Sequence, residues 1–504
     1  MRDVVQWLVR RGRTPAAAVL ALGGASASLS QTVCETAHVA ALDGGVFQNF
    51  GWAVDVSGDI ALVGAIEDSE NGNGAGAAYI FQFDGASWVQ TQKLLASDSH
   101  IGDSFGFSVA IDGDTAMIGA LQHLHVNSGN GSVYVFRRQG STWIEEQELL
   151  ASDGADEDAF GRAVSICGDV AVIGASGNDD DGFASGSAYV FRYDSQASLW
   201  IEQQKLTASD AAEFDGFGFA VAISGDRAVI GSPGDDDNDI NSGSAYVFRF
   251  DGSSWTQEQK LLASDGSFGD CFGQSVSISD DTALIGMSDD DGGTGAAYVF
   301  RYDPVFAEWF EQQKLVASDG VGSDNFGRSL SIDGSTAVIG ALFSDDVGPS
   351  SGSAYVFRFI EGKGWVEQQK LLPEPGPSAA IFGWSVALSG DTAIAGAIGE
   401  QAQAGGAYLF AGLLGTDCNG TGRADTCDIL FGPSEDANGN GIPDECEGQC
   451  PWDLDGSGDV GITDFLALLA AWGANPGHPA DFDGDGTVGI IDFLELLGNW
   501  GPCA

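Results

Sequence analysis

Short runs in which apolar and polar residues alternate follow one another along most of the chain. In one stretch, Ser108-Val-Ala-Ile111 is followed by the turn residues Gly113-Asp114 and then by Ala116-Met-Ile-Gly119. A polar loop leads to the aromatic run Val133-Tyr-Val-Phe136. A Trp and a Gln-Lys-Leu tract, as at Trp255 and 259–261, complete the unit. Period-two alternation bounded by Gly and Asp is typical of β-strands, so the pattern predicts four short strands per unit.

This unit recurs seven times. A Phe-Gly pair opens each copy, and successive pairs lie 54 to 57 residues apart. The pairs begin at Phe50, Phe105, Phe160, Phe217, Phe272, Phe326 and Phe382. One four-stranded sheet cannot bury both of its faces, whereas seven sheets stacked radially can. The repeat therefore predicts an all-β fold, a seven-bladed β-propeller over residues 28–412.

The two ends of the repeated region complement each other. The seventh unit stops after Ala407-Tyr-Leu-Phe410 and lacks the last strand. Before the first Phe-Gly pair, Val39-Ala-Ala-Leu-Asp43 resembles Leu94-Leu-Ala-Ser-Asp98, which follows the last strand of the first unit. We expect residues around 33–42 to supply the missing strand, because this would close the ring and remove two unpaired sheet edges.

The units resemble FG-GAP repeats. Besides the Phe-Gly opening, five units close their second strand with Gly-Ala, and two depart with Gly231-Ser232 and Gly286-Met287. The five are Gly64-Ala65, Gly119-Ala120, Gly174-Ala175, Gly340-Ala341 and Gly396-Ala397. The resemblance implies a propeller like those of integrin α-subunits and many exported bacterial proteins, and a role in extracellular recognition or adhesion. Calcium-binding members carry an Asp/Asn-rich loop between the first two strands. Here that connection is a tight turn, as in Ser57-Gly-Asp59, so this calcium site is not predicted.

Acidic residues gather instead between the second and third strands. They are Asp179 to Asp181, Asp235, Asp236, Asp237 and Asp239, Asp289 to Asp291, and Asp345 with Asp346. One interpretation is a face that binds cations or a basic partner, and the alternate spacing of Asp235, Asp237 and Asp239 could converge on one ion. The other interpretation is solvated turns, which Asp favours through hydrogen bonds to the local backbone. The repeated Phe and Trp are expected to pack between blades and along the outer strand.

After residue 412 the repeat gives way to two acidic loops of twelve residues in the region 413–449. Oxygen-bearing groups fall at positions 1, 3, 5, 7, 9 and 12 of each loop, with Gly422 or Gly441 at position 6. The predicted ligands are Asp417, Asn419, Thr421, Arg423, Asp425 and Asp428, then Asp436, Asn438, Asn440, Ile442, Asp444 and Glu447, with Arg423 and Ile442 acting through their carbonyls. This spacing is typical of calcium loops. The loops look like thrombospondin type 3 repeats. Cys418, Cys427, Cys446 and Cys450 lie among them, and a bond between Cys427 and Cys446 is one possible pairing.

Two further loops occupy residues 450–504, and each leads into an amphipathic stretch. The predicted Ca2+ ligands are Asp453, Asp455, Ser457, Asp459 and Asp464 in the first loop, and Asp481, Asp483, Asp485, Thr487 and Asp492 in the second. Helices are expected from Asp464 to Trp472 and from Asp492 to Trp500. The arrangement resembles a type I dockerin, an EF-hand-like α-helical module. The resemblance implies calcium binding and docking onto a cohesin-like partner, read by Ile462-Thr463 and Ile490-Ile491. Cys450 and Cys503 bracket the module.

Composition narrows the classes of partner and the location. The 504 residues include 73 Asp and Glu against 20 Lys and Arg, which gives a formal net charge of -53. This charge argues against nucleic acid or anionic membrane as a partner. Residues 1–27 read as a signal peptide, with four Arg before an apolar run and Ala25-Ser26-Ala27 as the cleavage site. No other stretch predicts a membrane span. The protein is therefore expected to be secreted, and extracellular or on the cell surface.

The sequence favours binding over catalysis. With 73 acidic residues no carboxylate pair can be selected, and no nucleophile elbow or nucleotide fingerprint stands out. The leading hypothesis is a secreted, calcium-binding, non-enzymatic interaction or adhesion protein. Its propeller would bind a glycan or protein ligand, and its tail would attach it to an extracellular protein scaffold. The alternatives are a polysaccharide-degrading protein that hydrolyses glycosidic bonds and is recruited by its dockerin-like tail, and a structural surface-layer component.

Overall fold

The computed structural model of the chain describes most of the repeated region and parts of the tail. It covers residues 34–122, 124–125, 128–373, 379–413, 434, 454, 459–474, 480, 487–498 and 501–502. The predicted signal peptide at 1–27 lies outside the described residues. So do the predicted calcium loops of 413–449, apart from residues 413 and 434.

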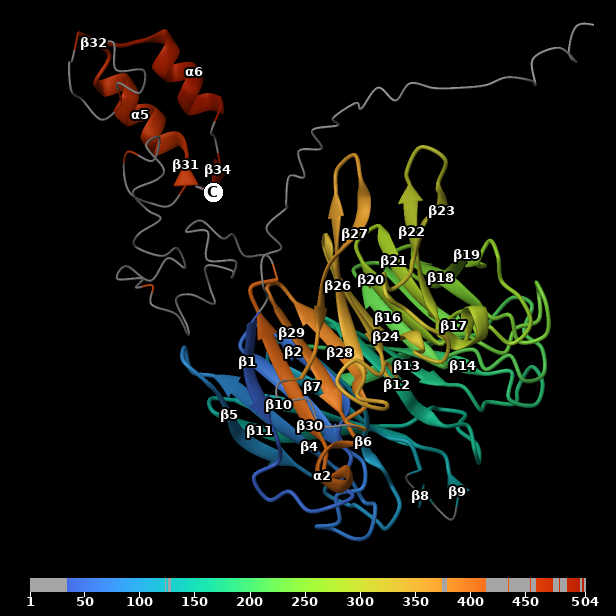
Figure 1. Cartoon of the computed structure of the whole chain (residues 1–504). Helices are drawn as coiled ribbons and strands as arrows, with labels where there is room; N and C mark the ends of the chain where they lie inside the picture. The colour runs from blue at the N-terminus through green and yellow to red at the C-terminus, as the bar shows by residue number, and fades with distance from the viewer. Residues whose placement is uncertain are drawn as a thin grey trace, which may run out of the picture. The chain divides into compact units, whose positions relative to one another are not determined.

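Seven four-stranded antiparallel sheets make up the repeated region, and each forms one blade (Figure 1). Blade 1 holds β2 (Phe50–Ser57), β3 (Ile60–Ala65), β4 (Ala77–Phe83) and β5 (Trp88–Leu94). Blade 2 holds β6 (Phe105–Asp112), β7 (Thr115–Ala120), β10 (Ser132–Gln139) and β11 (Thr142–Leu149), with a hairpin of β8 (Leu124–His125) and β9 (Ser128–Gly129). Blade 3 holds β12 (Phe160–Cys167), β13 (Val170–Ala175), β14 (Ser187–Asp194) and β15 (Leu199–Leu206).

The remaining blades repeat this order. Blade 4 holds β16 (Ala220–Ser224), β17 (Arg227–Ser232), β18 (Ser244–Phe250) and β19 (Trp255–Leu261). Blade 5 holds β20 (Ser275–Ser279), β21 (Thr282–Met287), β22 (Ala296–Asp303) and β23 (Glu308–Leu315), with the short α1 (Asp290–Gly293). Blade 6 holds β24 (Phe326–Asp333), β25 (Thr336–Ala341), β26 (Ser353–Ile360) and β27 (Gly364–Leu371). Blade 7 holds β28 (Phe382–Ser389), β29 (Thr392–Ala397), β30 (Gly406–Ala411) and β1 (Cys34–Val39), with α2 (Glu400–Gln403). The predicted seven-bladed propeller is confirmed.

The apolar core lies between neighbouring blades and not inside any one of them. Seven clusters of buried side chains fill the ring, one at each interface between blades. The second strand of a blade, such as β7, is buried along its whole length because a neighbouring sheet covers each face. A blade therefore depends on both neighbours for its hydrophobic stabilisation.

The Phe-Gly pair fits this interface. Phe105 packs edge-on against Tyr134 and Phe136, with ring centroids 5.5 and 6.2 Å apart, and its cluster includes side chains of blade 1. Gly106 has a φ of +94°, and a Cβ there would lie 2.5 Å from the carbonyl oxygen of Ala77 in blade 1. The Phe thus wedges between blades, as predicted, and the Gly lets the two backbones approach.

The repeated Gln and Trp form the outer link between blades. The side chain of Gln204 accepts a hydrogen bond from the backbone nitrogen of Trp255 at 2.8 Å and donates one to its carbonyl at 2.7 Å. The same two-bond link joins Gln92 to Trp143, Gln147 to Trp200, Gln259 to Trp309, and Gln313 to Trp365. These five Trp are buried, as expected, whereas Trp88 is half-buried.

The N-terminal strand completes the seventh blade, as predicted. β1 pairs antiparallel with β30, so that Val39 lies opposite Ala407. A parallel bridge between Phe50 and Gly405 joins blade 7 to blade 1 in the way that equivalent bridges join other neighbouring blades. The ring is therefore closed by chain segments more than 360 residues apart.

An ion pair holds this closing strand. His38 lies opposite Tyr408, the place that Lys93 takes opposite Tyr79 in blade 1. Its Nε2 lies 2.9 Å from Oε2 of Glu400, and its ring stacks on Tyr408 with centroids 4.4 Å apart. The hydrogen bond to Glu400 raises the pKa of His38; burial opposes the rise, and the charges of Glu400 and Glu35 add to it.

The described residues of the tail include two helices, α5 (Ile462–Ala470) and α6 (Ile490–Gly498). Short pairs join β31 (Asp459–Val460) to β34 (Gly501–Pro502), and β32 (Gly473–Ala474) to β33 (Thr487–Val488). Both helices begin and end two residues before the predicted limits. The reason is that Asp464 and Asp492 accept hydrogen bonds from the backbone nitrogens of Gly461 and Gly489, both at 2.7 Å. Each Asp therefore lies in the first turn, where a carboxylate is favourable, and not at the first residue.

A small core joins the two halves of the tail. Its buried residues are Val460, Leu468, Ala480, Val488 and Leu496. Phe465 and Phe493 lie against it with ring centroids 5.4 Å apart. Across the described ranges, no helix is long and apolar enough to cross a membrane. Cys167 and Cys271 are free, whereas Cys418, Cys427, Cys446, Cys450 and Cys503 lie outside the described residues.

Closure of the ring is predicted to weaken as the pH rises. Because the folded-state pKa of His38 is raised, its contribution is fully present below the unfolded value of 6.5 and is lost as the pH rises through the folded pKa. His38→Lys should remove this dependence, because Lys stays charged across the range. Raising the pH from about 6 to about 8.5 should lower the free energy of unfolding of the wild type by about 1 kcal/mol relative to that of His38→Lys. The value is modest because a third of the His38 side chain is exposed, where solvent screens its charge.

Thermal unfolding at a series of pH values measures this difference. Lys93→His is the matched control, since it places His opposite Tyr79 in blade 1 and should add a pH dependence of the same sign. Identical pH profiles for the wild type and His38→Lys would contradict the assignment.

Candidate functional site

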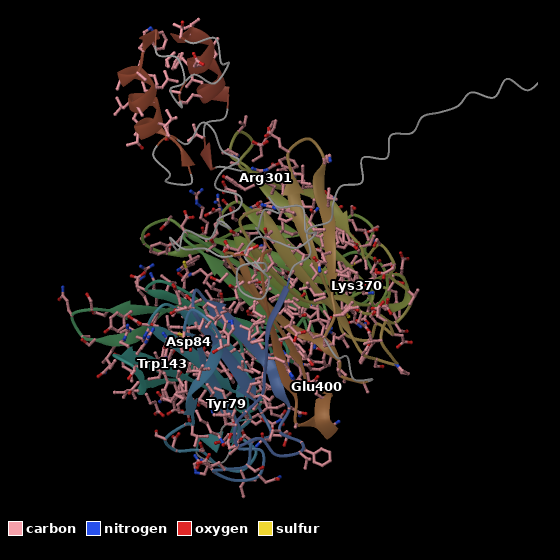
Figure 2. The ribbon with its side chains drawn as sticks, turned by 60° about the vertical axis from the view of Figure 1, so that its left-hand side comes forward. Tyr79, Asp84, Trp143, Arg301, Lys370 and Glu400 are labelled. Atoms are coloured by element: carbon pink, nitrogen blue, oxygen red, sulfur yellow. The ribbon has the colours of Figure 1, made fainter. Side chains whose placement is uncertain are left out.

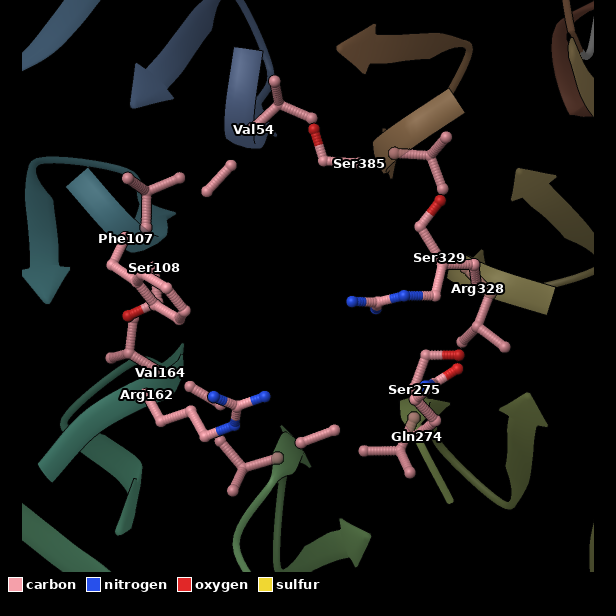
Figure 3. A pocket seen from close by; sticks show the side chains of 18 of the residues that line it. Val54, Phe107, Ser108, Arg162, Val164, Gln274, Ser275, Arg328, Ser329 and Ser385 are labelled. Atoms are coloured by element: carbon pink, nitrogen blue, oxygen red, sulfur yellow. The ribbon is translucent and has the colours of Figure 1, made fainter. Parts of the chain in front are cut away.

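A pocket of about 260 Å³ lies on the axis of the ring (Figure 3). The seven inner strands surround it, and each blade contributes the residue that follows the Phe-Gly pair, which lies in the inner strand or directly before it. Those residues are Trp52, Phe107, Arg162, Phe219, Gln274, Arg328 and Trp384. The two residues that follow this position in each blade also line the pocket. The repeat thus places seven equivalent positions around one space.

Four aromatic side chains form much of the wall. The rings of Trp52 and Trp384 have centroids 4.8 Å apart, and Trp52 lies 5.6 Å from Phe107. The guanidinium carbon of Arg162 lies 3.7 Å from the ring centroid of Phe219, and that of Arg328 lies 5.6 Å from Trp384. These four aromatic side chains are half-buried, so part of each ring is exposed to the hollow and makes its wall partly apolar.

The two guanidinium groups point into the pocket from opposite sides (Figure 3). Burial, with a smaller effect from the charge of Arg328, lowers the pKa of Arg162 to about 10. Burial also lowers the pKa of Arg328, and the charge of Asp289 opposes this. The site therefore disfavours the charge of both guanidinium groups. Within the described part of the chain, Nε of Arg162 has no hydrogen-bond partner.

Hydrogen bonds between inner strands hold the pocket wall. Ser108 donates to the carbonyl of Gly161 in the next blade at 2.7 Å. The same bond joins Ser275 to Gly327, Ser329 to Gly383, and Ser385 to Gly51. The wall is thus built from backbone that is fixed on both sides, which suits a preformed binding site.

A lysine lies among the acidic residues that were expected to converge on an ion. Nζ of Lys260 lies 2.8, 2.8 and 2.7 Å from carboxylate oxygens of Asp210, Asp235 and Asp237. Burial opposes the charge of Lys260, but these hydrogen bonds outweigh burial and raise its pKa. The hypothesis of one ion held by Asp235, Asp237 and Asp239 is therefore wrong, because an ammonium group occupies the point of convergence. Asp239 instead accepts a hydrogen bond from the backbone of Ile240.

Equivalent lysine clusters recur around the ring. Tyr79, Lys370 and Glu400, each from the cluster of a different blade, are labelled in Figure 2. Lys93 pairs with Asp43, Asp68 and Glu70, and Lys205 pairs with Asp153 and Asp180. Lys314 pairs with Asp265 and Asp290, and Lys370 pairs with Asp319 and Asp346. Blade 2 has Glu148 there, and no Asp lies in its loop between β7 and β10. The lysine and the acid of this loop are thus lost together, whereas Asp98 remains and accepts a hydrogen bond from Tyr134.

Other acidic loop residues are turn residues, as the second interpretation predicted. Asp179, Asp236 and Asp345 accept hydrogen bonds of 2.6, 2.7 and 2.8 Å from backbone nitrogens five residues later. The acidic loops therefore have two separate structural roles, turn formation and ion pairing with lysine. No cluster of three or more His, Cys, Asp or Glu suited to a metal occurs among the described residues.

Most of the predicted calcium ligands lie outside the described residues. Asp459, Asp464, Thr487 and Asp492 lie within them. Asp464 and Asp492 are buried at equivalent places in α5 and α6, and Asp464 also accepts a hydrogen bond from the backbone nitrogen of Leu454 at 2.7 Å. Thr487 is exposed in β33. The two halves of the module thus present matching buried carboxylates.

Comparison with known families gives one match to the repeats. The FG-GAP repeat model matches residues 34–81, 88–136, 143–191, 200–248, 255–300, 309–357 and 365–410. The chain belongs to the FG-GAP repeat family. Each FG-GAP segment begins with the outer strand of one blade and ends in the third strand of the next; 88–136, for example, starts with β5 and ends in β10. One FG-GAP repeat therefore spans an interface between blades, which is why the first match begins in β1.

The pocket residues are the functional candidates that sequence reasoning missed. A signal was present. The residue after Phe-Gly varies among Trp, Phe, Arg and Gln, whereas its neighbours in the FG-GAP unit hardly change. A variable position inside a uniform repeat indicates a role outside the repeated packing. Its convergence on one axis becomes visible only in the closed ring.

Lys260→Ala is predicted to lower the free energy of unfolding by about 2–3 kcal/mol, because it leaves the buried Asp235 without a counter-charge. Urea unfolding measures the change, with Lys363→Ala, at an exposed lysine, as the control. Added calcium should not restore stability. Equal unfolding midpoints for the two variants would count against the ion-pair cluster.

Arg162→Gln is predicted to raise the free energy of unfolding by about 1–2 kcal/mol, because it removes a charge that burial and Arg328 both disfavour. Arg301→Gln makes the same charge change at an exposed site of the ring and should leave stability nearly unchanged. Chemical denaturation compares the variants. A loss of stability in Arg162→Gln would show that the pocket charge is structural.

Proposed function

We propose that the protein is a secreted, calcium-binding, non-enzymatic interaction or adhesion protein. Its ring binds a ligand, and its tail attaches it to an extracellular scaffold. The axial pocket is the observation that carries this proposal, since it combines a rigid wall, aromatic faces and two charged groups in one hollow. The family match agrees at the level of a binding or adhesion-type propeller.

The end of the ring that carries the pocket also has the features of a binding face. Inner strands begin at this end, and the loops after the second and fourth strands lie around it. Of the large apolar side chains exposed there, five are Phe, namely Phe47, Phe183, Phe214, Phe268 and Phe343. Exposed aromatic groups around a hollow are typical of interaction surfaces.

The described helices of the tail support a role in attachment. Ile462, Leu466 and Leu469 of α5 are exposed, as are Ile490, Leu494 and Leu497 of α6. Each set recurs at helical spacing and so forms one apolar stripe on its helix. Ile462 and Ile490, which were expected to read the partner, are 63% and 61% exposed. A cohesin-like protein with an apolar face is the partner that this surface fits.

Calcium is the proposed cofactor of the tail, held by the four loops predicted from the sequence. Carboxylates gathered within ~4–5 Å repel one another by roughly 1 kcal/mol per pair even in water, and a divalent cation reverses that sign. The described core of the last module contains only five buried residues, so metal binding is expected to stabilise its fold. Export through the predicted signal peptide would supply the extracellular calcium.

Calcium titration of the full mature chain tests this proposal. We expect calorimetry to detect calcium binding, and chelator to lower the helical circular-dichroism signal, because the loops release their ion. Asp453→Asn with Asp481→Asn should remove two binding events. Asp235→Asn with Asp237→Asn makes the same change in the ring and should remove none, since Lys260 occupies that cluster.

Attachment is measured by the calcium-dependent retention of the chain on the outer surface of cells of its source. Retention should be lost with chelator and in the Asp453→Asn, Asp481→Asn variant. Unchanged calcium stoichiometry in that variant would overturn the assignment of the tail.

A further inference from the structure

We propose that the axial pocket binds a single carboxylate carried on a six-membered ring, either a sugar acid or an aromatic acid. The inference rests on the proposed binding role of the ring and names the ligand chemistry of the same site. Arg162 and Arg328 would hold the carboxylate, and the aromatic wall would stack on the ring that carries it.

The pocket carries positive charge, whereas the molecule as a whole is strongly negative. Only 20 of 504 residues are Lys or Arg, and 73 are acidic. The lysines of the clusters nevertheless all pair with carboxylates, as at Lys260 and Lys314. Arg162 and Arg328 instead face each other across a shared hollow, and the described residues include no carboxylate in an ion pair with either (Figure 3). The charge of Asp289 acts on Arg328 without forming an ion pair with it. Two guanidinium groups that share a hollow without an ion-pair partner among the described residues are suited to an anion that arrives from outside, and their planar fork matches a carboxylate.

The wall defines what can carry that carboxylate. Trp52 and Trp384 lie 4.8 Å apart at one side, and Phe107 and Phe219 flank Arg162 at the other. Aromatic faces stack on flat rings, including the apolar face of a sugar. The hollow of about 260 Å³ is close to the lower limit of small-molecule sites, which suits one ring and not a long chain.

The surrounding field limits the ligand to one negative charge. A formal net charge of -53 repels polyanions such as nucleic acids and heavily charged polysaccharides. A ligand with one carboxylate is repelled only weakly by this negative field, and in the pocket it gains two charge-assisted hydrogen bonds. The pocket therefore selects a terminal acidic ring, and the rest of the ligand would be neutral.

Calorimetry with four probes tests the proposal on the full calcium-loaded chain at constant ionic strength. Sodium glucuronate and sodium benzoate represent the two sources of the acid. Glucose has the shape of glucuronate without the charge, and sodium sulfate has charge without a ring. At least one ring acid should bind about tenfold tighter than glucose and about tenfold tighter than sulfate.

Variants identify the groups responsible. Arg162→Gln with Arg328→Gln should weaken binding of the preferred acid by about tenfold, to the level of glucose. Arg301→Gln is the matched control and should bind like the wild type. Trp384→Ala should weaken the acid and glucose alike, because it removes stacking and not charge. The melting temperature of the double variant is measured alongside, and a value no lower than that of the wild type shows that a loss of affinity is not due to unfolding.

The outcomes separate this inference from the proposed function. Equal affinity for glucose and glucuronate, retained in the double Arg variant, would overturn the anion assignment and leave a binding ring. If sulfate bound as tightly as both acids, the claim that the pocket selects a ligand with a six-membered ring would be wrong. If none of the probes bound at tens of millimolar, the inference would fail as a whole, while retention on cells would still test attachment.

Discussion

The structure depends on one constraint, which is that each sheet can bury its apolar faces only against its neighbours. All seven clusters of the ring lie between blades, so no blade has a core of its own. A linear stack would leave two faces in water, and closure removes both. The Phe wedge, the Gly contact and the Gln-to-Trp link are all devices of this interface. The pairing of β1 with β30 makes the last blade equivalent to the others.

Electrostatics follows from the same repetition. In a chain with so many acids the carboxylates of the loops repel one another, and the lysine on the outer strand reduces this repulsion by pairing with two or three carboxylates in each of five blades. Blade 7 uses His38 and Glu400 in the same geometry. Because the lysines are consumed in this way, Arg162 and Arg328 become the distinctive charges of the molecule, and the axis differs in character from the surface around it.

The repeat also assigns stability and ligand binding to different positions of each unit. Positions that face a neighbouring blade are nearly invariant among the units, since every interface has the same shape. The residue after Phe-Gly lines the axial pocket and differs from blade to blade. A ring of identical blades can therefore present an asymmetric wall, with Trp52 and Trp384 on one side and Arg162 on another. The tail repeats the principle at smaller scale, with matching Asp464 and Asp492 and an exposed stripe on each helix.

The sequence by itself determined the number of blades, their four strands, the wedge made by Phe105 and its equivalents, and the closure by residues around 33–42. These features depend on local alternation and on a repeat that can be read along the chain. It also indicated the two helices of the tail, with limits displaced by two residues because backbone capping by Asp464 and Asp492 depends on folded geometry. Only the tertiary structure decided that Lys260 lies among the acids proposed to hold an ion, and that Arg162 and Arg328 meet across the axis. The physical reason is that these residues lie 25 and 166 positions apart in the chain, and the distance between their side chains is set by the folding of the blade and the closure of the ring, which the alternation of apolar and polar residues along a strand does not encode.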